Sequence, residues 1–224
     1  MVASEAVRAE WGRRVVAEYR SAATTHALVG WLIEVGASPD LVRDGLRVVD
    51  DELRHAELSA GVFAAAGGRP SPAIDRATLR PARVEPVEHS IVRACVECFC
   101  LGETVAVPLF RRMLAGASEP VAVSTLRRIV ADEARHRRFG WELLDHCRDI
   151  MPSAVDSVLQ AELPRMKAAV FAAYGEGVGD VIPEADRAWG LIAPAEYRAE
   201  LLRTERGWWA RRLPTQPASA QSCR

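Results

Sequence analysis

Two segments of this chain share the pattern Asp-Glu-x-Arg-His, and each lies inside a long amphipathic stretch. The first reads DELRH at 51–55, and the second reads DEARH at 132–136. In each copy the Glu and the His stand three residues apart, so on a helix they are neighbours on one face. The fold must therefore contain two helices that each present a carboxylate and an imidazole together.

Clusters of Pro and Gly divide the chain into long helical patterns, and strand patterns are nearly absent. We expect helices over about 4–35, 39–66, 87–115 and 119–148, followed by 152–174 and 194–212. The similar turns GASPD and GASEP supply helix-ending glycines and the expected N-caps Ser38 and Ser118. A longer connection at 67–86 joins the two hairpins. This order predicts an all-α fold, a four-helix bundle of two hairpins with one long crossover, plus C-terminal helices.

Length and composition fit one bundle with an extension. The 224 residues are 49% hydrophobic, and we assign 1–150 to the bundle, 151–213 to a helical extension and 214–224 to a disordered tail. A net charge of -1 gives no basis for nucleic-acid binding. No apolar run approaches the ~20 residues of a membrane helix, and no signal peptide is recognisable. The five cysteines, an odd number, fit reduced thiols in a cytoplasmic protein.

The acids of both repeats are expected to point into the core. At about 100° per residue, Glu52 falls on an otherwise apolar stripe with Val48, and Glu133 falls with Leu126 and Ile129. A buried carboxylate without a partner is costly. A bound cation would remove that cost.

A dinuclear site in such a bundle needs one more Glu from the first helix of each hairpin. In the first helix, Glu18 is the only acid on the inner stripe. The third helix offers Glu103, which lies among apolar residues, and Glu97, which lies on the polar side. There Glu97 can pair with Arg93 at i,i+4. Glu103 is our choice, although the distance of Glu97 from its turn matches that of Glu18 better.

The predicted metal ligands are thus four glutamates and two histidines. Oxygen and imidazole donors in this ratio suit iron or manganese better than zinc. The six residues are Glu18, Glu52, His55, Glu103, Glu133 and His136.

The remaining residues of the repeat are predicted to support the histidines. A metal-bound His usually donates its second N–H to a carboxylate. We therefore expect Asp51 to contact His136 and, by the same symmetry, Asp132 to contact the histidine of the first repeat. The arginines of the repeats, Arg54 and Arg135, would hold the aspartates. Ordinary surface charges explain these aspartates and arginines almost as well.

Other side chains are candidates for a pocket beside the ligands. Cys100 lies one turn before Glu103, and a small core residue is the alternative reading. His26 lies two turns after Glu18, and a structural histidine is the alternative there. The full set of pocket residues or alternative ligands is Glu97, Cys100, His26 and Thr104.

The order Glu…Glu-x-x-His…Glu…Glu-x-x-His over about 10–148 resembles the motif of ferritin-like di-iron carboxylate proteins. DELRH and DEARH are similar to segments of bacterial multicomponent monooxygenase hydroxylases. ECF at 97–99 resembles aldehyde-deformylating oxygenases, in which that Glu is a ligand. The chain is far shorter than the monooxygenases, and 150–224 has no counterpart. The resemblance implies a ferritin-like bundle holding two Fe ions, with Mn as the alternative.

The same resemblance implies a non-haem di-iron oxygenase or oxidase. It would use dioxygen to oxidise a small organic substrate by hydroxylation, N-oxygenation or oxidative cleavage, with no catalytic group beyond the ligands. Because no flavin or nicotinamide fingerprint is recognisable, electrons are expected from an external reductase or ferredoxin. A ferroxidase or iron-storage protein and a dimanganese catalase are the alternatives, and the long extension argues against the former. GWWARR at 207–212 would form an aromatic lid or a homodimer contact.

Overall fold

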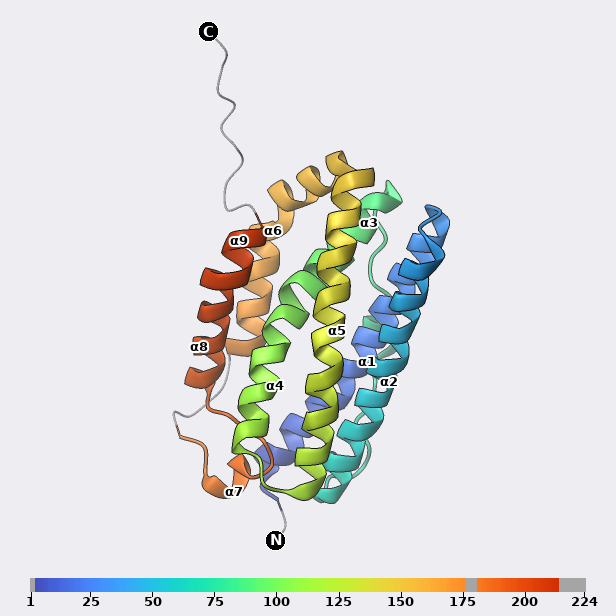
Figure 1. The fold of residues 1–224 in the computed structure, drawn as a ribbon. Coiled ribbons are helices and arrows are strands. Elements are labelled where there is room, and N and C mark those ends of the chain that lie inside the picture. The colour runs from blue at the N-terminus through green and yellow to red at the C-terminus, as the bar shows by residue number, and fades with distance from the viewer. Residues whose placement is uncertain (1–2, 176–180, 214–224) are drawn as a thin grey trace.

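The computed structural model describes residues 3–175 and 181–213, and within these ranges every regular element is helical. Four long segments lie side by side (Figure 1). They are α1 (Glu5–Glu34), α2 (Pro39–Ala65), a composite of α3 (Val87–Ala94), η2 (Cys95–Glu103) and α4 (Thr104–Gly116), and α5 (Pro120–Ile150). The all-α prediction is confirmed, and the helix limits agree with those expected from the sequence to within about two residues.

The turn between α1 and α2 has the predicted construction. Gly36 ends the first helix with φ +71°, a left-handed conformation that glycine adopts without strain. The Ser38 hydroxyl accepts a hydrogen bond from the Leu41 N–H at 3.4 Å and so caps α2.

The turn before α5 is built differently, and the expected Ser118 cap is wrong. The N-cap of α5 is Glu119, and it makes no side-chain cap bond. Instead, the N–H groups of Ser118 and Glu119 donate to the Ala188 carbonyl at 2.8 and 2.9 Å. The C-terminal extension therefore takes part in closing this turn.

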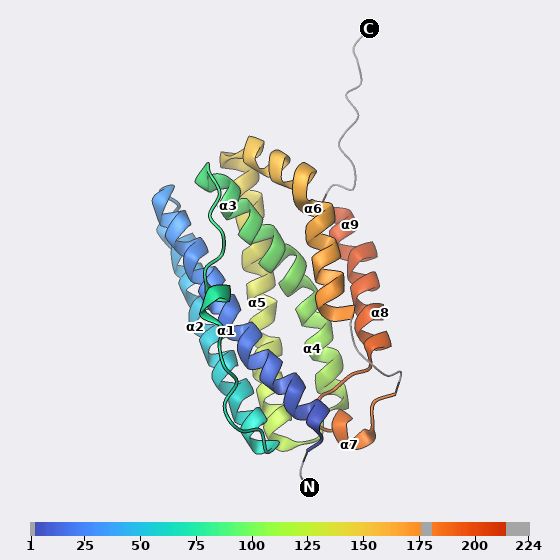
Figure 2. The same cartoon turned by 180° about the vertical axis from the view of Figure 1, so that it is seen from behind.

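The connection at 67–86 runs along the length of the bundle beside α1 (Figure 2). It contains the short helix η1 (Arg76–Leu79) and returns the chain to the end where α2 began. As a result, α2 and the composite third segment run in the same direction, as expected for two hairpins joined by one crossover.

The extension packs against the α4 side of the bundle (Figure 1). It comprises α6 (Pro152–Gly175), α7 (Glu184–Arg187), α8 (Pro194–Thr204), η3 (Glu205–Trp209) and α9 (Ala210–Arg212). Trp209 is fully buried, and its indole Nε1 donates to the Cys100 carbonyl at 3.1 Å. This contact fits an aromatic lid on the bundle. The tail predicted at 214–224 lies outside the described residues.

The third segment is not a regular α-helix, because η2 is π-helical over Cys95–Glu103. A π-helix has i→i+5 hydrogen bonds and a wider turn, and it occurs frequently at functional sites. Gly140 of α5 lets this wide turn approach, since a Cβ built on Gly140 would lie 2.1 Å from the Phe99 Cβ.

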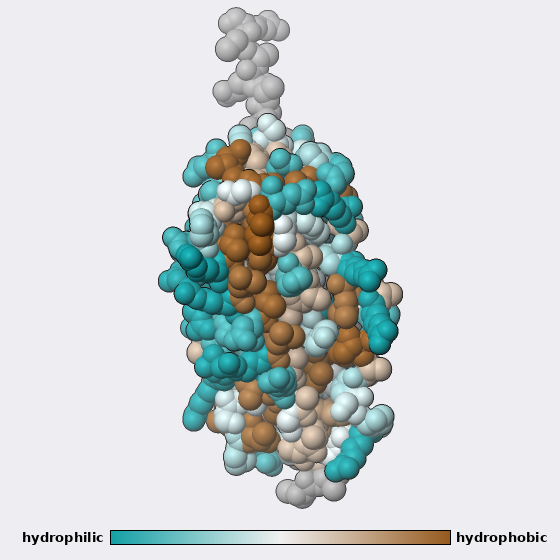
Figure 3. Space-filling view, turned by 90° about the vertical axis from the view of Figure 1, so that its right-hand side faces the viewer, coloured by the Kyte–Doolittle hydropathy of each residue, from teal (hydrophilic) through white to brown (hydrophobic). Residues whose placement is uncertain are grey.

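The face formed by α1 and α2 carries Ile33, Leu46 and Leu53 as exposed apolar residues. Apolar patches lie between hydrophilic side chains there (Figure 3). Among the described helices, none combines the length and apolar character needed to cross a membrane.

Candidate metal centre

Six buried acids and histidines from all four long segments gather inside the bundle. They form two groups, and in each group one ligand atom per residue lies within 4.8 Å of the others. The first group is Glu18, Glu52, His55 and Glu133, and the second is Glu52, Glu103, Glu133 and His136.

Glu52 and Glu133 belong to both groups, so each carboxylate can reach two neighbouring cations. Glu18 belongs to the first group alone and Glu103 to the second alone. The arrangement could hold two adjacent cations, with two carboxylates common to both groups and one further carboxylate in each. The shared pair comes from the two copies of the repeat.

Both histidines turn the same ring nitrogen toward the carboxylates. His55 Nδ1 lies 3.6 Å from Glu133 Oε1 and 3.9 Å from Glu18 Oε2. His136 Nδ1 lies 3.2 Å from Glu52 Oε1 and 3.3 Å from Glu133 Oε2. The Nδ1 lone pairs are therefore placed to act as ligands.

The Nε2 atoms point away from the carboxylates, each toward an aspartate of the opposite hairpin. His55 Nε2 lies 3.1 Å from Asp132 Oδ2, and His136 Nε2 lies 3.4 Å from Asp51 Oδ2. This is the crossed pairing expected from the repeat. An aspartate that accepts the Nε2–H leaves Nδ1 unprotonated for a metal.

One arginine ties the two aspartates together. Arg135 Nη2 lies 2.8 Å from Asp51 Oδ2 and 2.7 Å from Asp132 Oδ1. His136 and Arg135 lower the pKa of Asp51 far below its usual range, despite the opposing effect of burial. Asp51 is therefore ionised and can polarise the imidazole.

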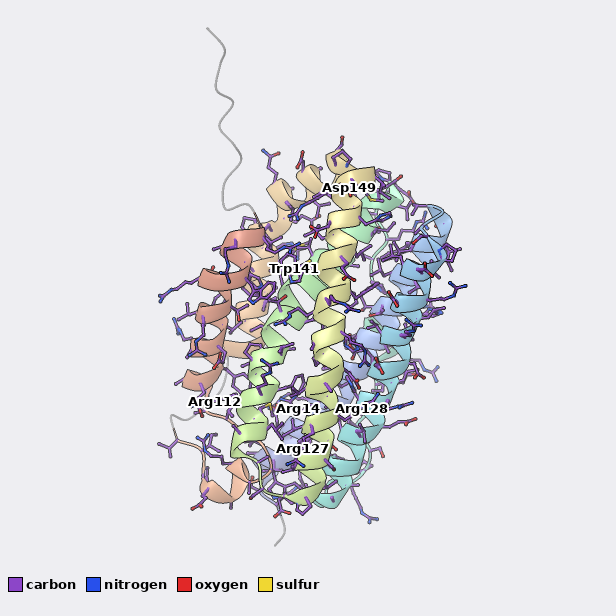
Figure 4. All side chains as sticks on the ribbon, in the orientation of Figure 1. Arg14, Arg112, Arg127, Arg128, Trp141 and Asp149 are labelled. Carbon is purple, nitrogen blue, oxygen red and sulfur yellow. The ribbon has the colours of Figure 1, made fainter. Side chains whose placement is uncertain are left out.

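Sequence periodicity missed a second arginine, Arg128, which points from α5 toward α2 (Figure 4). Its Nε donates to Asp132 Oδ2 at 2.6 Å, and its Nη2 lies 3.5 Å from Asp51 Oδ1. The available signal was its i,i+4 spacing from Asp132. The expectation for Arg54 is wrong, because this side chain is exposed and lies 3.6 Å from Asp50.

The polar atoms of the cluster lack partners that would justify their burial. Those without a hydrogen-bond partner include both Oε atoms of Glu52, Glu133 Oε2, and Nδ1 of His55 and His136. Buried polar atoms of this kind call for an explanation such as an ion. Metal cations between these oxygens and nitrogens would satisfy them together.

The pKa shifts of two carboxyl groups in the cluster also indicate that a compensating positive charge is missing. Burial and the nearby Glu52 and Glu133 raise the pKa of Glu18 well above its usual value. Burial and Glu133 do the same to the pKa of Glu103. Without a cation, burial and the neighbouring carboxylates therefore favour the protonated form of Glu18 and Glu103.

The third segment contributes Glu103 and not Glu97 to the two groups. Glu103 is buried, whereas Glu97 is half-buried and lies outside both groups. The expected Glu97–Arg93 pair is wrong, because Arg93 Nε lies 3.1 Å from Glu162 Oε2 instead. Glu97 lies in the π-helical segment, whose wider turn changes the angular relation of Glu97 to Arg93 in α3.

The remaining pocket candidates do not gather at the ligands in the same way. Cys100 is buried with its Sγ 3.6 Å from the Gly140 carbonyl, so it packs against α5. The Thr104 hydroxyl is buried and accepts a hydrogen bond from Trp141 Nε1 at 3.0 Å. His26 is exposed and lines no core pocket, because the neighbouring Thr25 takes the inward position.

No protein-family model matches this sequence, and neither a curated protein nor a solved structure is significantly similar to the chain. What the centre can do therefore follows from its own residues and geometry.

Proposed function

We propose that the centre holds two metal ions and that the fold is a ferritin-like di-iron bundle. Glu18 and His55 would bind one ion, Glu103 and His136 the other, and the carboxylates of Glu52 and Glu133 would bridge them. The observation that carries the proposal is the pair of shared carboxylates facing two Nδ1 atoms that have no hydrogen-bond partner. The donor set favours iron, with manganese as the alternative.

We infer further that the protein is a non-haem di-iron oxygenase or oxidase acting on a small organic substrate. A bound pair of iron ions would supply the redox chemistry that activates dioxygen. No catalytic side chain beyond the metal ligands is proposed.

The surrounding residues prepare the centre for this role. Asp51 and Asp132 fix the histidine rings by accepting their Nε2–H groups, and Arg135 holds both aspartates. One turn beyond His136, Phe139 packs edge-to-face on Phe99 with ring centroids 5.1 Å apart. Both rings are buried, so this part of the core is apolar.

Metal loading under anaerobic conditions tests the site. The protein should bind close to two ferrous ions per chain, and the double variant Glu52→Ala/His136→Ala should lose that loading. Glu57→Ala is the matched control, because Glu57 is an exposed acid on the same helix. Retention of two irons by the double variant would show that the proposed ligands are wrong.

Dioxygen consumption then separates the oxygenase from the ferroxidase alternative. An oxygenase or oxidase should consume dioxygen repeatedly when a reductant is supplied, with iron remaining at two per chain. A ferroxidase should instead accumulate ferric iron beyond that stoichiometry. A protein that loads iron but shows neither behaviour would contradict both functions.

A further inference from the structure

Two stacked tryptophans lead from the outer surface to Thr104, the residue that follows the candidate ligand Glu103. Trp208 is 37% exposed and stacks on buried Trp141, with ring centroids 6.2 Å apart and an interplanar angle of 26°. The Trp141 indole Nε1 donates to Thr104 Oγ1 at 3.0 Å. Thr104 directly follows Glu103, so the contacts continue to the neighbour of a candidate ligand. Trp141 lies between the bundle and the C-terminal helices (Figure 4).

Cationic side chains surround these rings. The guanidinium of Arg137 lies 4.9 Å from the centroid of Trp208, and that of Arg212 lies 4.8 Å from Trp141. Arg212 is paired with Asp145. Arg137 and Arg111 repel each other electrostatically, and neither makes an ion pair with a carboxylate in 3–175 or 181–213.

Two neighbouring cations that lack carboxylate partners among the described residues, beside an exposed tryptophan, favour an anionic partner. Residues 214–224, which directly follow Leu213, contain no Asp or Glu side chain. The opposite side of the centre is different. There Arg128 and Arg135 are already paired with Asp51 and Asp132.

We propose that Trp208, Arg137 and Arg111 form the docking site of an acidic one-electron donor protein. Trp141 and Thr104 form the path from the docked donor to the metal centre. The inference rests on the proposed function and names its electron partner. In each transfer the donor's cofactor loses one electron and one ferric ion becomes ferrous, so no covalent bond forms or breaks.

Binding is tested first on the metal-free protein, with an acidic plant-type [2Fe–2S] ferredoxin as the probe. Titration should show binding that weakens with added salt. Arg111→Gln/Arg137→Gln should weaken it by about tenfold or more, since loss of interface arginines commonly costs over 1 kcal/mol. Arg43→Gln/Arg47→Gln on α2 is the matched control and should bind normally, because both are exposed arginines on another face.

Electron transfer is tested on the ferric-loaded protein by anaerobic stopped flow. At saturating ferredoxin, Trp208→Leu should slow reduction severalfold, and Trp208→Phe should restore most of the rate because the ring stack is retained. Reduction by dithionite, which needs no docking, should be unchanged in both variants.

Two results would overturn the inference while iron loading stays at two per chain. One is equal ferredoxin binding by wild type and the Arg111/Arg137 variant. The other is an equal slowing of ferredoxin and dithionite reduction by Trp208→Leu, which would indicate a structural effect. Failure of the proposed function is distinguishable, because it appears as absent iron loading in the wild-type protein before any ferredoxin is added.

Discussion

At the residue scale, Asp51 Oδ2 lies within hydrogen-bond reach of both His136 Nε2 and Arg135 Nη2. Asp51→Asn keeps a hydrogen-bond acceptor but removes the negative charge that polarises the His136 ring. We expect metal affinity to fall by about 10–100-fold, as for other partners of metal-bound histidines. Chelator competition with ferrous or manganous ion measures this change. Asp50→Asn is the control, since Asp50 is exposed and pairs with Arg54; an equal loss in both variants would contradict the assigned role.

The two glutamates of the third segment allow a second comparison at this scale. Glu103→Ala should lose metal, because Glu103 is buried within the second ligand group. Glu97→Ala should retain it, because Glu97 lies outside both groups. Metal analysis of the two purified variants decides between them. The reverse outcome would mean that the π-helical segment presents Glu97 to the metals.

At the element scale, the contact of the π-helical segment with α5 depends on Gly140. A Cβ there would lie 2.1 Å from the Phe99 Cβ and 3.2 Å from its backbone carbon, so the helices must separate. Gly140→Ala should lower the free energy of unfolding by about 1–3 kcal/mol, the usual cost of overpacking. Denaturant titration provides the measurement.

Gly61→Ala in α2 is the matched control for this effect. Nothing lies within 4 Å of a Cβ at Gly61, so helix propensity alone should stabilise the protein by about 0.5–1 kcal/mol. If Gly140→Ala stabilised the protein as Gly61→Ala should, Gly140 of α5 would not be in close contact with Phe99 of the π-helical segment.

Sequence periodicity was sufficient to identify the buried acids where the backbone is a regular helix. Glu18, Glu52 and Glu133 were assigned to the core from the 3.6-residue period, and all three are buried. The period could not reveal the π-helical segment, because its wider turn depends on packing against Gly140. The i,i+4 spacing of Arg128 from Asp132 was an available signal, but spacing along one helix could not reveal the contact of Arg128 with Asp51 on another helix.

At the scale of the whole molecule, metal binding and stability are linked through protons. The pKa values of Glu18 and Glu103 are raised in the metal-free fold. The folded state therefore binds protons that the unfolded chain releases above about pH 4.5, so metal-free stability falls as pH rises. Bound cations would replace these protons, so stabilisation by manganese should be greater near pH 8 than near pH 6.

Thermal unfolding with and without manganese measures this linkage. Each kcal/mol of stabilisation corresponds to about 2–4 °C for a chain of this size. Glu18→Gln removes one of the two raised carboxyl groups, so its metal-free form should lose less stability with rising pH than wild type. A manganese effect that is independent of pH would contradict the proton–metal exchange.

The π-helical segment also breaks the symmetry between the two halves of the molecule. Glu18 stands on the regular helix α1, whereas Glu103 closes a wide π-turn that the C-terminal helices cover through Trp209. Two ions held by the same kinds of donor would thus have different surroundings, one beside the regular helix α1 and one beside the π-helical segment. Occupancy is expected to be stepwise, with the regular-helix position filling first and the π-turn position remaining the more exchangeable of the two.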